Sequence, residues 1–413
     1  MKELLSDSTF IKDLETLSIN CKKKPIVLFF GRDNFSDNTK YLFLSCQRSN
    51  PNFEYIWCCW NDKLHESLVE RGLPTILLTK DHLKHIKLLL RASFAVFCQN
   101  PFTEVRGNMY LLSALAGAKK IQLWHGISLK QLHLSNIENV DLVDSEKRTF
   151  PVSACVGDFV ASTARQFDQY WLDVFGKKEI LRVGMTRNEV IFRKPDRFEL
   201  IHAVFDDKIL DVFRRPSKKI LVAPTWQKNK FNWLYSPEFL EKLESFGEQH
   251  DVDFFVKPHP WTPYIIINQL NKFEKEFKKY NRIFNISAEI DIYPWLNRFS
   301  AMISDYSSIM FDFLLTRKPT LALTIPDQER YMNEPDYSLI PDLSGIYFFG
   351  EDDFEDTLKA SLQDHSKIDK QEQLISRLFE SDPKSSCADL IRFIESEIAI
   401  EKQREPVVRM LSS

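Results

Sequence analysis

Glycine is scarce in this chain of 413 residues, which has 11 glycines where average usage of about 7% would give about 29. A phosphate-binding loop needs several glycines close together so that the backbone can wrap around the ligand. Neither G-x-G-x-x-G nor G-x-x-x-x-G-K-[ST] occurs in the sequence. The scarcity therefore excludes a glycine-loop nucleotide site. Each glycine that is present is expected where the backbone needs positive φ or a close approach.

Other absences narrow the class of protein further. No run of apolar residues is long enough to span a bilayer, and the N-terminal stretch MKELLSD lacks the basic and apolar regions of a signal peptide, so we expect a cytoplasmic location. The seven cysteines form no C-x-x-C pair and are predicted to be reduced thiols in the core rather than disulfides or zinc ligands. A net charge of −3 argues against a dedicated nucleic-acid binder.

Short apolar runs alternate with longer amphipathic stretches along most of the chain. Continuous β-branched and aromatic runs are typical of parallel strands that are buried on both faces. The first series of predicted strands covers 25–30, 54–60, 74–79, 95–99, 120–124, 154–161 and 180–183, and the second covers 219–223, 253–257, 282–286, 301–304, 320–323 and 346–349. Helical periodicity lies between strands, for example at 237–249 and 263–280.

Two series of alternating strands and helices predict an α/β protein with two Rossmann-like, doubly wound parallel-sheet domains that face a central cleft, an architecture that many nucleotide-sugar transferases share. The predicted boundaries are 1–195 for the N-terminal domain and 196–390 for the C-terminal domain. Residues 391–413 would form a C-terminal helix and tail. Ligands of open α/β sheets bind beyond the carboxyl ends of the strands, so the functional residues are expected where strands end.

One histidine follows a strand in each predicted domain. His125 comes after strand 120–124 and is followed at once by Gly126, which lets a substrate approach the backbone. His259 stands between two prolines after strand 253–257, next to Lys257. Imidazole titrates near neutrality, which suits a general base. Each histidine alone could also be a structural residue of a turn, but the pair predicts catalytic groups on the two sides of a cleft.

Polar residues also follow three other strands. Asp305 with Ser307 and Ser308 stands between a strand and an apolar helix, where hydroxyls and helix N–H groups can hold a phosphate. Arg187 and Asn188 follow the strand 180–183 and could bind a phosphate or hydroxyls. Thr225 and Trp226 follow strand 219–223 and could hold a base or phosphate. Helix capping and turn formation are the alternatives at all three places.

No metal ligand set is evident. Asp251 and Asp253 have D-x-D spacing but precede their strand, so they should lie at the opposite edge of the sheet. We therefore expect no obligatory metal, although a divalent ion such as Mg2+ could accompany a bound nucleotide.

Together, these strings resemble a known family, the CDP-glycerol glycerophosphotransferases, which are the TagB/TagF-like enzymes of teichoic acid and capsule synthesis. The resemblance covers about residues 95–390. Its five strings occur in the family's order: Trp124-His125-Gly126, Gly184 with Arg187-Asn188, Ala223-Pro224-Thr225-Trp226, Lys257 with His259-Pro260, and Asp305-Tyr306-Ser307-Ser308 with Met310-Phe311-Asp312-Phe313. Where the family commonly has Thr-Pro-Leu-Lys after Trp-His-Gly, this chain has Ile127-Ser128-Leu129-Lys130.

The resemblance implies a GT-B fold and transfer of an alditol phosphate, most often glycerol phosphate, from a CDP-alditol to a hydroxyl of a surface polymer or lipid-linked primer, with release of CMP. It implies that His125 and His259 are the essential histidines and that Ser307 and Ser308 lie near the donor diphosphate. The alternative is a GT-B glycosyltransferase that moves a sugar from a nucleotide-sugar.

Family members work at the inner face of the cell membrane, so the resemblance also implies a peripheral protein with a membrane surface among its partners. Two basic clusters could meet anionic lipid, at Lys22-Lys23-Lys24 and at Arg214-Arg215 with Lys218-Lys219. Both could equally be ordinary solvated faces.

Overall fold

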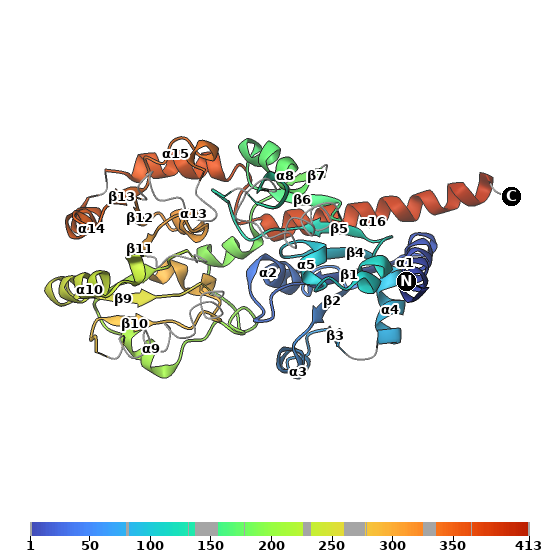
Figure 1. The fold of residues 1–413 in the computed structure, drawn as a ribbon, viewed down its shortest axis with the longest axis horizontal. Helices are drawn as coiled ribbons and strands as arrows, with labels where there is room; N and C mark the ends of the chain where they lie inside the picture. The colour runs from blue at the N-terminus through green and yellow to red at the C-terminus, as the bar shows by residue number, and fades with distance from the viewer. Residues whose placement is uncertain are drawn as a thin grey trace. The chain divides into compact units, whose positions relative to one another are not determined.

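The computed structural model describes residues 2–79, 82–130, 132–136, 156–176, 178–225, 233–259, 277, 279–324, 336–364 and 366–411 (Figure 1). The chain divides into two compact units. The first unit contains Met1–His125, His133–Glu189 and Ser381–Ser413, and the second contains Gly126–Leu132 and Val190–Glu380. The short segment Gly126–Leu132 therefore packs with the second unit although it interrupts the sequence of the first.

The first unit is built on a sheet of seven strands that are parallel throughout, in the order β3-β2-β1-β4-β5-β6-β7. The strands are β1 (Lys24–Phe30), β2 (Glu54–Cys59), β3 (Thr75–Leu77), β4 (Ala92–Phe97), β5 (Lys119–Gln122), β6 (Phe159–Ser162) and β7 (Glu179–Arg182). The central strands β1 and β4 are almost wholly buried, as their unbroken apolar runs require.

Helices cover both faces of this sheet. They are α1 (Lys2–Asn20), α2 (Asp37–Cys46), α3 (Asp62–Glu70), α4 (His82–Arg91), α5 (Pro101–Glu104), α6 (Met109–Ala114), α8 (Asp168–Phe175) and α16 (Ser386–Leu411), with 3-10 turns at His133–Asn136, Arg165–Phe167 and Thr186–Phe192. The C-terminal helix α16 packs on this sheet, where the Phe393 ring contacts Phe94 of β4 and Phe159 of β6 (Figure 1).

The second unit contains a sheet of six parallel strands in the order β10-β9-β8-β11-β12-β13. The strands are β8 (Lys218–Val222), β9 (Val252–Val256), β10 (Ile283–Asn285), β11 (Ala301–Ser304), β12 (Thr320–Leu323) and β13 (Tyr347–Phe349). The helices are α9 (Asp207–Phe213), α10 (Pro237–His250), α13 (Ile309–Leu314), α14 (Phe354–Gln363) and α15 (Ile368–Leu378), with 3-10 turns at Trp233–Tyr235, Tyr293–Arg298 and Tyr337–Leu339.

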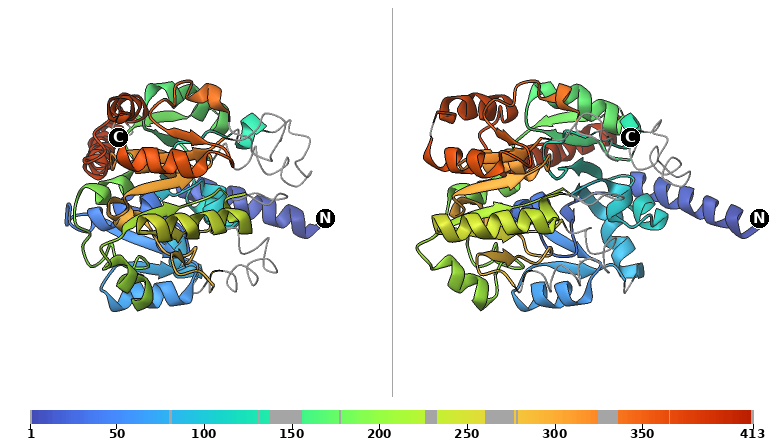
Figure 2. Two further views of the ribbon diagram at one scale, coloured as in Figure 1. Left: turned by 90° about the vertical axis from the view of Figure 1, so that its left-hand side faces the viewer. Right: turned by 60° about the vertical axis from the view of Figure 1, so that its left-hand side comes forward.

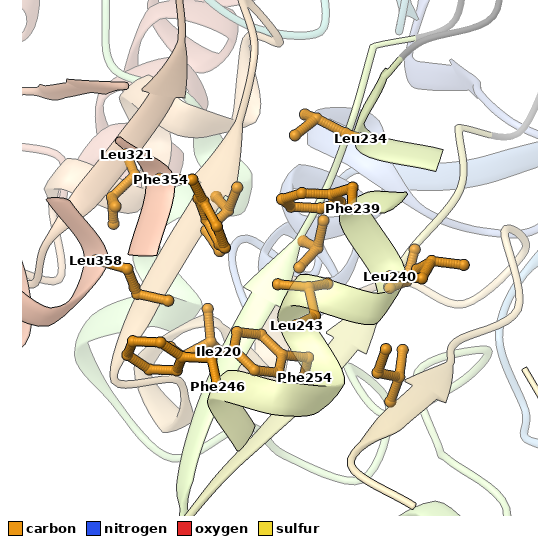
Figure 3. Close-up of a cluster of buried hydrophobic side chains, with 14 of the residues drawn as sticks. Ile220, Leu234, Phe239, Leu240, Leu243, Phe246, Phe254, Leu321, Phe354 and Leu358 are labelled. Carbon is orange, nitrogen blue, oxygen red and sulfur yellow. The ribbon is translucent and has the colours of Figure 1, made fainter. Parts of the chain in front are cut away.

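Helices α10 and α14 cover one face of the second sheet (Figure 2). Phe239 and Leu243 of α10 meet Ile220 of β8 and Phe254 of β9 in a cluster that Phe354 of α14 completes (Figure 3). The sequence explains the start and end of α10. The Ser236 hydroxyl accepts a hydrogen bond from the N–H of Phe239, proline occupies the first turn, and Asp251 ends the helix with φ of 53°.

All thirteen predicted strands are present, so the predicted fold of two doubly wound parallel sheets is confirmed. The predicted first and last residues of the strands are less accurate than the strands themselves. The fourth strand begins at Ala92 rather than at 95 because backbone pairing with β1 extends beyond the apolar run. The helix predicted at 237–249 is confirmed, whereas that predicted at 263–280 lies almost wholly outside the described residues, as do positions 154 and 155 of the sixth predicted strand.

Two other expectations concern the domain boundaries and the state of the cysteines. The predicted domain boundaries, 1–195, 196–390 and 391–413, stay predictions, and the contacts of the chain group Ser381–Ser413 with the first sheet. Among the described residues, the cysteines are free thiols, of which Cys46, Cys58, Cys59, Cys98 and Cys387 are buried. Burial raises the pKa of Cys46 and Cys58 well above the usual thiol value, which keeps them protonated.

Candidate functional site

The order of strands in the second sheet places its switch point between β8 and β11, because the chain winds outward from these two strands in opposite directions. Thr225 follows β8 and Asp305 follows β11. The Asp305 carboxylate accepts a hydrogen bond from the Thr225 hydroxyl at 2.6 Å and bonds from the Thr225 N–H at 3.1 Å, and its Oδ1 also accepts from the Tyr306 N–H at 2.6 Å. Both side chains are buried, so these bonds hold the two strand ends together.

Ser307 and Ser308 continue from Asp305 at this edge and are both half-buried. Ser308 occupies the N-cap position of α13, but its hydroxyl makes no capping hydrogen bond. The alternative, that this serine only caps the helix, does not hold for its side chain, because the residue has helical φ and ψ, from which the hydroxyl does not turn back to the first turn. The Ser308 hydroxyl is therefore not used to cap the helix.

Lys257 and His259 follow β9, the neighbour of β8 at the same edge. The N–H of Lys257 continues the ladder by donating to the Val222 carbonyl, and its Nζ donates to the Ala288 carbonyl at 2.9 Å. His259 is half-buried and follows the buried Pro258. Trp226, which the sequence also assigned to this site, lies outside the described residues.

Lys130 is a residue of this site that the sequence analysis did not assign. Its Nζ lies 5.1 Å from the centroid of the Tyr306 ring, and the neighbouring Leu129 carbonyl accepts a hydrogen bond from the N–H of Asp336. Burial lowers the pKa of Lys130 to about 8, against the opposing effect of the Asp305 charge. Position 130 follows His125 in the sequence, and only the packing of Gly126–Leu132 with the second unit brings it to Asp305.

In the first unit, His125 stands three residues beyond the end of β5 and is half-buried. The turn that holds it has two unusual conformations, since Trp124 has φ of 59° and Gly126 has φ of 129°. The Trp124 ring lies 4.3 Å from the His125 ring and also packs edge-on against Trp171 and Phe175. The positive φ of Gly126 confirms the expectation that a glycine stands where the backbone needs a conformation that other residues rarely adopt.

Arg187 and Asn188 lie in the 3-10 turn after β7 and are both buried, with 4% and 0% of their surfaces exposed. The Arg187 guanidinium donates to Asp37 at 2.6 Å and to the His125 carbonyl at 2.9 Å. Burial alone would raise the pKa of Asp37, but the charges of Arg187 and Arg32 outweigh it and hold that pKa well below its usual range. No motif or spacing distinguishes Asp37, which has the position of an ordinary first-turn acid of α2.

No group of three or more His, Cys, Asp or Glu side chains among the described residues has the arrangement of a metal site. Asp251 and Asp253 lie at the start of β9, as the sequence predicted, and Arg282 binds both carboxylates at 2.9 and 3.2 Å. None of the helices in the described part of the chain combines the length and apolar character needed to cross a bilayer.

Two parallel α/β sheets, each with polar side chains beyond the carboxyl ends of its strands, define an architecture of the GT-B type. The chain belongs to the CDP-Glycerol:Poly(glycerophosphate) glycerophosphotransferase family, whose model matches residues 14–395.

Curated relatives carry the same family resemblance at low identity. The chain is 26% identical over 323 residues to a teichoic acid poly(glycerol phosphate) polymerase of Staphylococcus epidermidis, and the match covers 74% of this chain but 41% of that protein. It is 24% identical over 354 residues to the corresponding polymerase of Bacillus spizizenii, covering 81% of this chain and 79% of the relative. It is 25% identical to a teichoic acid glycerol-phosphate primase of Bacillus subtilis, over 61% of this chain and 64% of the primase.

Solved structures agree on the fold. A variant of the wall teichoic acid polymerase TagF soaked with CDPG superimposes with a TM-score of 0.67 at 21% identity, covering 95% of this chain and 94% of the other. A UDP-N-acetylglucosamine 2-epimerase from Listeria monocytogenes superimposes with a TM-score of 0.57 at 12% identity, covering 92% of this chain and 97% of the epimerase chain. Identities this low support the architecture alone.

Proposed function

We propose that this protein transfers an alditol phosphate, with glycerol phosphate as the preferred group, from a CDP-alditol to a hydroxyl of a cell-surface polymer or lipid-linked primer and releases CMP. The observation that carries the proposal is the family match over residues 14–395. The relatives, described as polymerases and primases of glycerol phosphate, support the same chemistry.

We assign the donor to the second unit. Ser307 and Ser308 stand beside the switch point of the sheet, where ligands of such folds bind, and the Ser308 hydroxyl does not cap α13. In this proposal they bind the donor diphosphate, and Lys257 and Lys130 add positive charge. Thr225 and Asp305 shape the loop, because their polar groups are already bonded to each other. His259 donates a hydrogen bond as negative charge builds on the departing CMP.

We assign the acceptor to the first unit, with His125 as general base. The acceptor oxygen attacks the β-phosphorus of the CDP-alditol and forms a new P–O bond, while the bond between that phosphorus and the bridging oxygen breaks. The acceptor proton passes to His125, and CMP leaves with the bridging oxygen. Phosphoryl transfer depends mainly on positioning and charge stabilisation, which two preorganised histidines can supply without a metal bound by the protein.

The donor panel is the direct test. The protein is incubated with CDP-glycerol, CDP-ribitol, and UDP- and CDP-sugars in the presence of a glycerol phosphate primer, and nucleotide release is followed by chromatography. CMP release from a CDP-alditol, with a phosphodiester in the product, is the expected result. Release of a nucleoside diphosphate from a sugar donor, with a glycosidic product, would replace the proposal by the sugar-transfer alternative.

The magnesium requirement is settled by the same assay. Activity with CDP-glycerol is compared in EDTA and in added Mg2+. We expect turnover to persist in EDTA, because the residues proposed to bind the diphosphate are hydroxyls and ammonium groups rather than carboxylates. Loss of all activity in EDTA, restored by Mg2+, would contradict this part of the mechanism.

We also propose that the protein works at the inner face of the cell membrane as a peripheral protein. Only part of each basic cluster supports this location. Lys23 turns inward to the Ser18 and Leu90 carbonyls and Lys219 to the Ser217 carbonyl, whereas Lys22 and Lys24 are exposed. Sedimentation with anionic vesicles, and its loss in a Lys22→Glu/Lys24→Glu variant, would support the location; equal sedimentation with neutral vesicles would contradict it.

A further inference from the structure

Asp37 and Asn38, two adjacent residues at the start of α2, form hydrogen bonds with two other chain segments. One is the turn that carries His125, and the other is the turn after β7 that carries Arg187. Asn38 is 1% exposed, and its Nδ2 donates to the Trp124 carbonyl at 2.7 Å. Its Oδ1 accepts from the N–H of Arg187 at 3.1 Å, and its carbonyl accepts from the Thr186 hydroxyl at 2.6 Å. The Asn38 side chain thereby joins the turn before His125, which lies 86 positions later in the sequence, to the turn after β7, which lies 149 positions later.

Asp37 completes the connection through Arg187. Its Oδ1 accepts from the Arg187 guanidinium at 2.6 Å, and its Oδ2 accepts from Arg32 at 3.0 Å. The Arg187 guanidinium also donates to the His125 carbonyl at 2.9 Å. Trp124 and His125, two consecutive residues, are therefore each held through the backbone carbonyl, one by Asn38 and the other by Arg187.

The backbone that these bonds hold is strained. Trp124 has φ of 59° and Asp37 has φ of 72°, both in the left-handed region that costs a non-glycine residue roughly 1–2 kcal/mol. Such conformations persist where the surroundings over-determine them, and they cluster at functional sites. Here the bond to Asn38 and the aromatic packing on Trp171 and Phe175 impose the conformation of Trp124.

The turn that carries Arg187 is itself fixed from its other side by the first turn of α16. The Glu189 carboxylate accepts from the N–H of Cys387 at 2.6 Å. Gly184 stands so close to Ser386 that a Cβ on the glycine would lie 2.2 Å from the serine Oγ. Arg187 therefore projects from a rigid turn, and its two bonds have a defined direction.

We propose that Asp37, Asn38 and Arg187 form a positioning network for His125: they fix the backbone on which the imidazole stands, so that the imidazole meets the acceptor hydroxyl in one orientation. The proposal rests on the function proposed above. It reassigns Arg187 from the substrate to the interior of the protein, because its bonds run to Asp37 and to the His125 carbonyl. A buried ion pair of this kind contributes little net stability compared with apolar residues of the same size, whereas its directional bonds fix geometry.

Two variants each remove one bond to the backbone of this turn, and Asn38→Asp also removes the contact of Nδ2 with the Met185 sulfur. Asn38→Asp keeps the acceptor for the Arg187 N–H and loses the donor to the Trp124 carbonyl. Arg187→Lys keeps a positive charge beside Asp37 and loses the second donor, which binds the His125 carbonyl. The matched control is Glu199→Gln, which weakens the pair that the buried Glu199 forms with Arg193 in the second unit. Thermal unfolding shows which variants fold, and a single folded variant of the two is sufficient for the test.

The first readout is the kinetics of CMP release from CDP-glycerol with a glycerol phosphate primer. We expect kcat to fall about 10- to 100-fold in both variants, because a small misplacement of a catalytic group costs up to that factor, while KM for CDP-glycerol changes less than about 2-fold. Glu199→Gln should keep the wild-type kcat even if its melting temperature falls. Wild-type kcat in both folded variants, or a loss of kcat in the control equal to theirs, would overturn the proposal.

The second readout does not depend on activity. Diethyl pyrocarbonate acylates accessible imidazoles, and mass spectrometry measures the acylation rate at His125 and at His259 separately. The variants should change the rate at His125 several-fold and leave that at His259 unaltered. If the wild-type protein acts on no CDP-alditol, the proposed function fails while this measurement still decides whether the network positions His125. An unchanged rate at His125 would overturn the network.

Discussion

Asp305 binds the hydroxyl and the N–H of Thr225 at once, and these bonds join the ends of β8 and β11 at the switch point of the second sheet. The carboxylate is 2% exposed and accepts from three donors, so it acts as a fixed part of the loop. An aspartate that a motif search would assign to the substrate is thus committed to the protein. The hydroxyls of Ser307 and Ser308, two and three residues later, are the groups that we propose bind the donor.

Asp305→Asn should therefore lower stability and weaken donor binding together. An amide nitrogen in place of one carboxylate oxygen would face the N–H or hydroxyl of Thr225 and leave a buried donor unpaired, at a cost of about 1–3 kcal/mol. Urea unfolding measures the cost, and KM for CDP-glycerol should rise. Thr225→Ser, which keeps the hydroxyl, is the control. Asp305→Asn with unaltered stability and KM would show that these bonds do not hold the site.

His125→Ala and His259→Ala should each abolish CMP release while the melting temperature stays within about 2 °C of wild type, because both side chains are half-buried at loop positions and neither supports the core. The matched control is His250→Ala, at the exposed end of α10. Retained binding of CDP-glycerol in His125→Ala, measured by calorimetry, would separate an acceptor-side base from a donor ligand. Near-normal turnover in that variant would refute its assignment as base.

The fold was predictable from sequence because buried parallel strands leave continuous apolar runs such as 25–30 and 301–304, and β11 matches its predicted bounds. The same logic selected the strand-terminal residues His125, His259 and Asp305 as candidates, and their roles stay predictions. Lys130 and Asp37 were not selected, since each acts through a contact between segments far apart in the chain. The sequence analysis assigned Arg187 to a ligand, and a sequence does not show that this guanidinium binds a buried carboxylate 150 positions earlier.

Lys130 should couple stability to pH in a direction opposite to that of a paired surface lysine. Its pKa is lowered to about 8 in the folded protein, against about 10.4 for an unperturbed lysine. Between these values the unfolded chain binds more protons, so stability rises with pH. Relative to Lys130→Met, the wild type should gain on the order of 1 kcal/mol of unfolding free energy between pH 7.5 and 9.5. An equal pH dependence of the two proteins would contradict a buried ammonium group.

The same lysine should matter for the donor. Lys130→Met removes a positive charge beside the Asp305–Tyr306 turn and should raise KM for CDP-glycerol about 10-fold, the factor that one lost charge-assisted hydrogen bond of about 1.5 kcal/mol gives. Lys130→Arg keeps the charge and should recover part of the loss. A Lys130→Met protein with normal KM and kcat would place this group outside the donor site.

Glu104, at the end of α5 in the first unit, should make the protein less stable as the pH rises through the acid range. Burial raises the pKa of Glu104 to about 7, and the charge of Arg32 only partly opposes this effect. Between about 4.3 and 7 the folded state holds a proton that the unfolded chain has lost, so unfolding free energy decreases with pH across this window and is constant above it.

Glu104→Gln keeps an acceptor for the N–H of Gln99, which the Glu104 carboxylate binds at 3.2 Å. The variant should match the wild type near pH 4 and exceed it at pH 8 by on the order of 2 kcal/mol. Unfolding curves that stay parallel from pH 5 to 8 would show that Glu104 is ionised in the folded protein throughout.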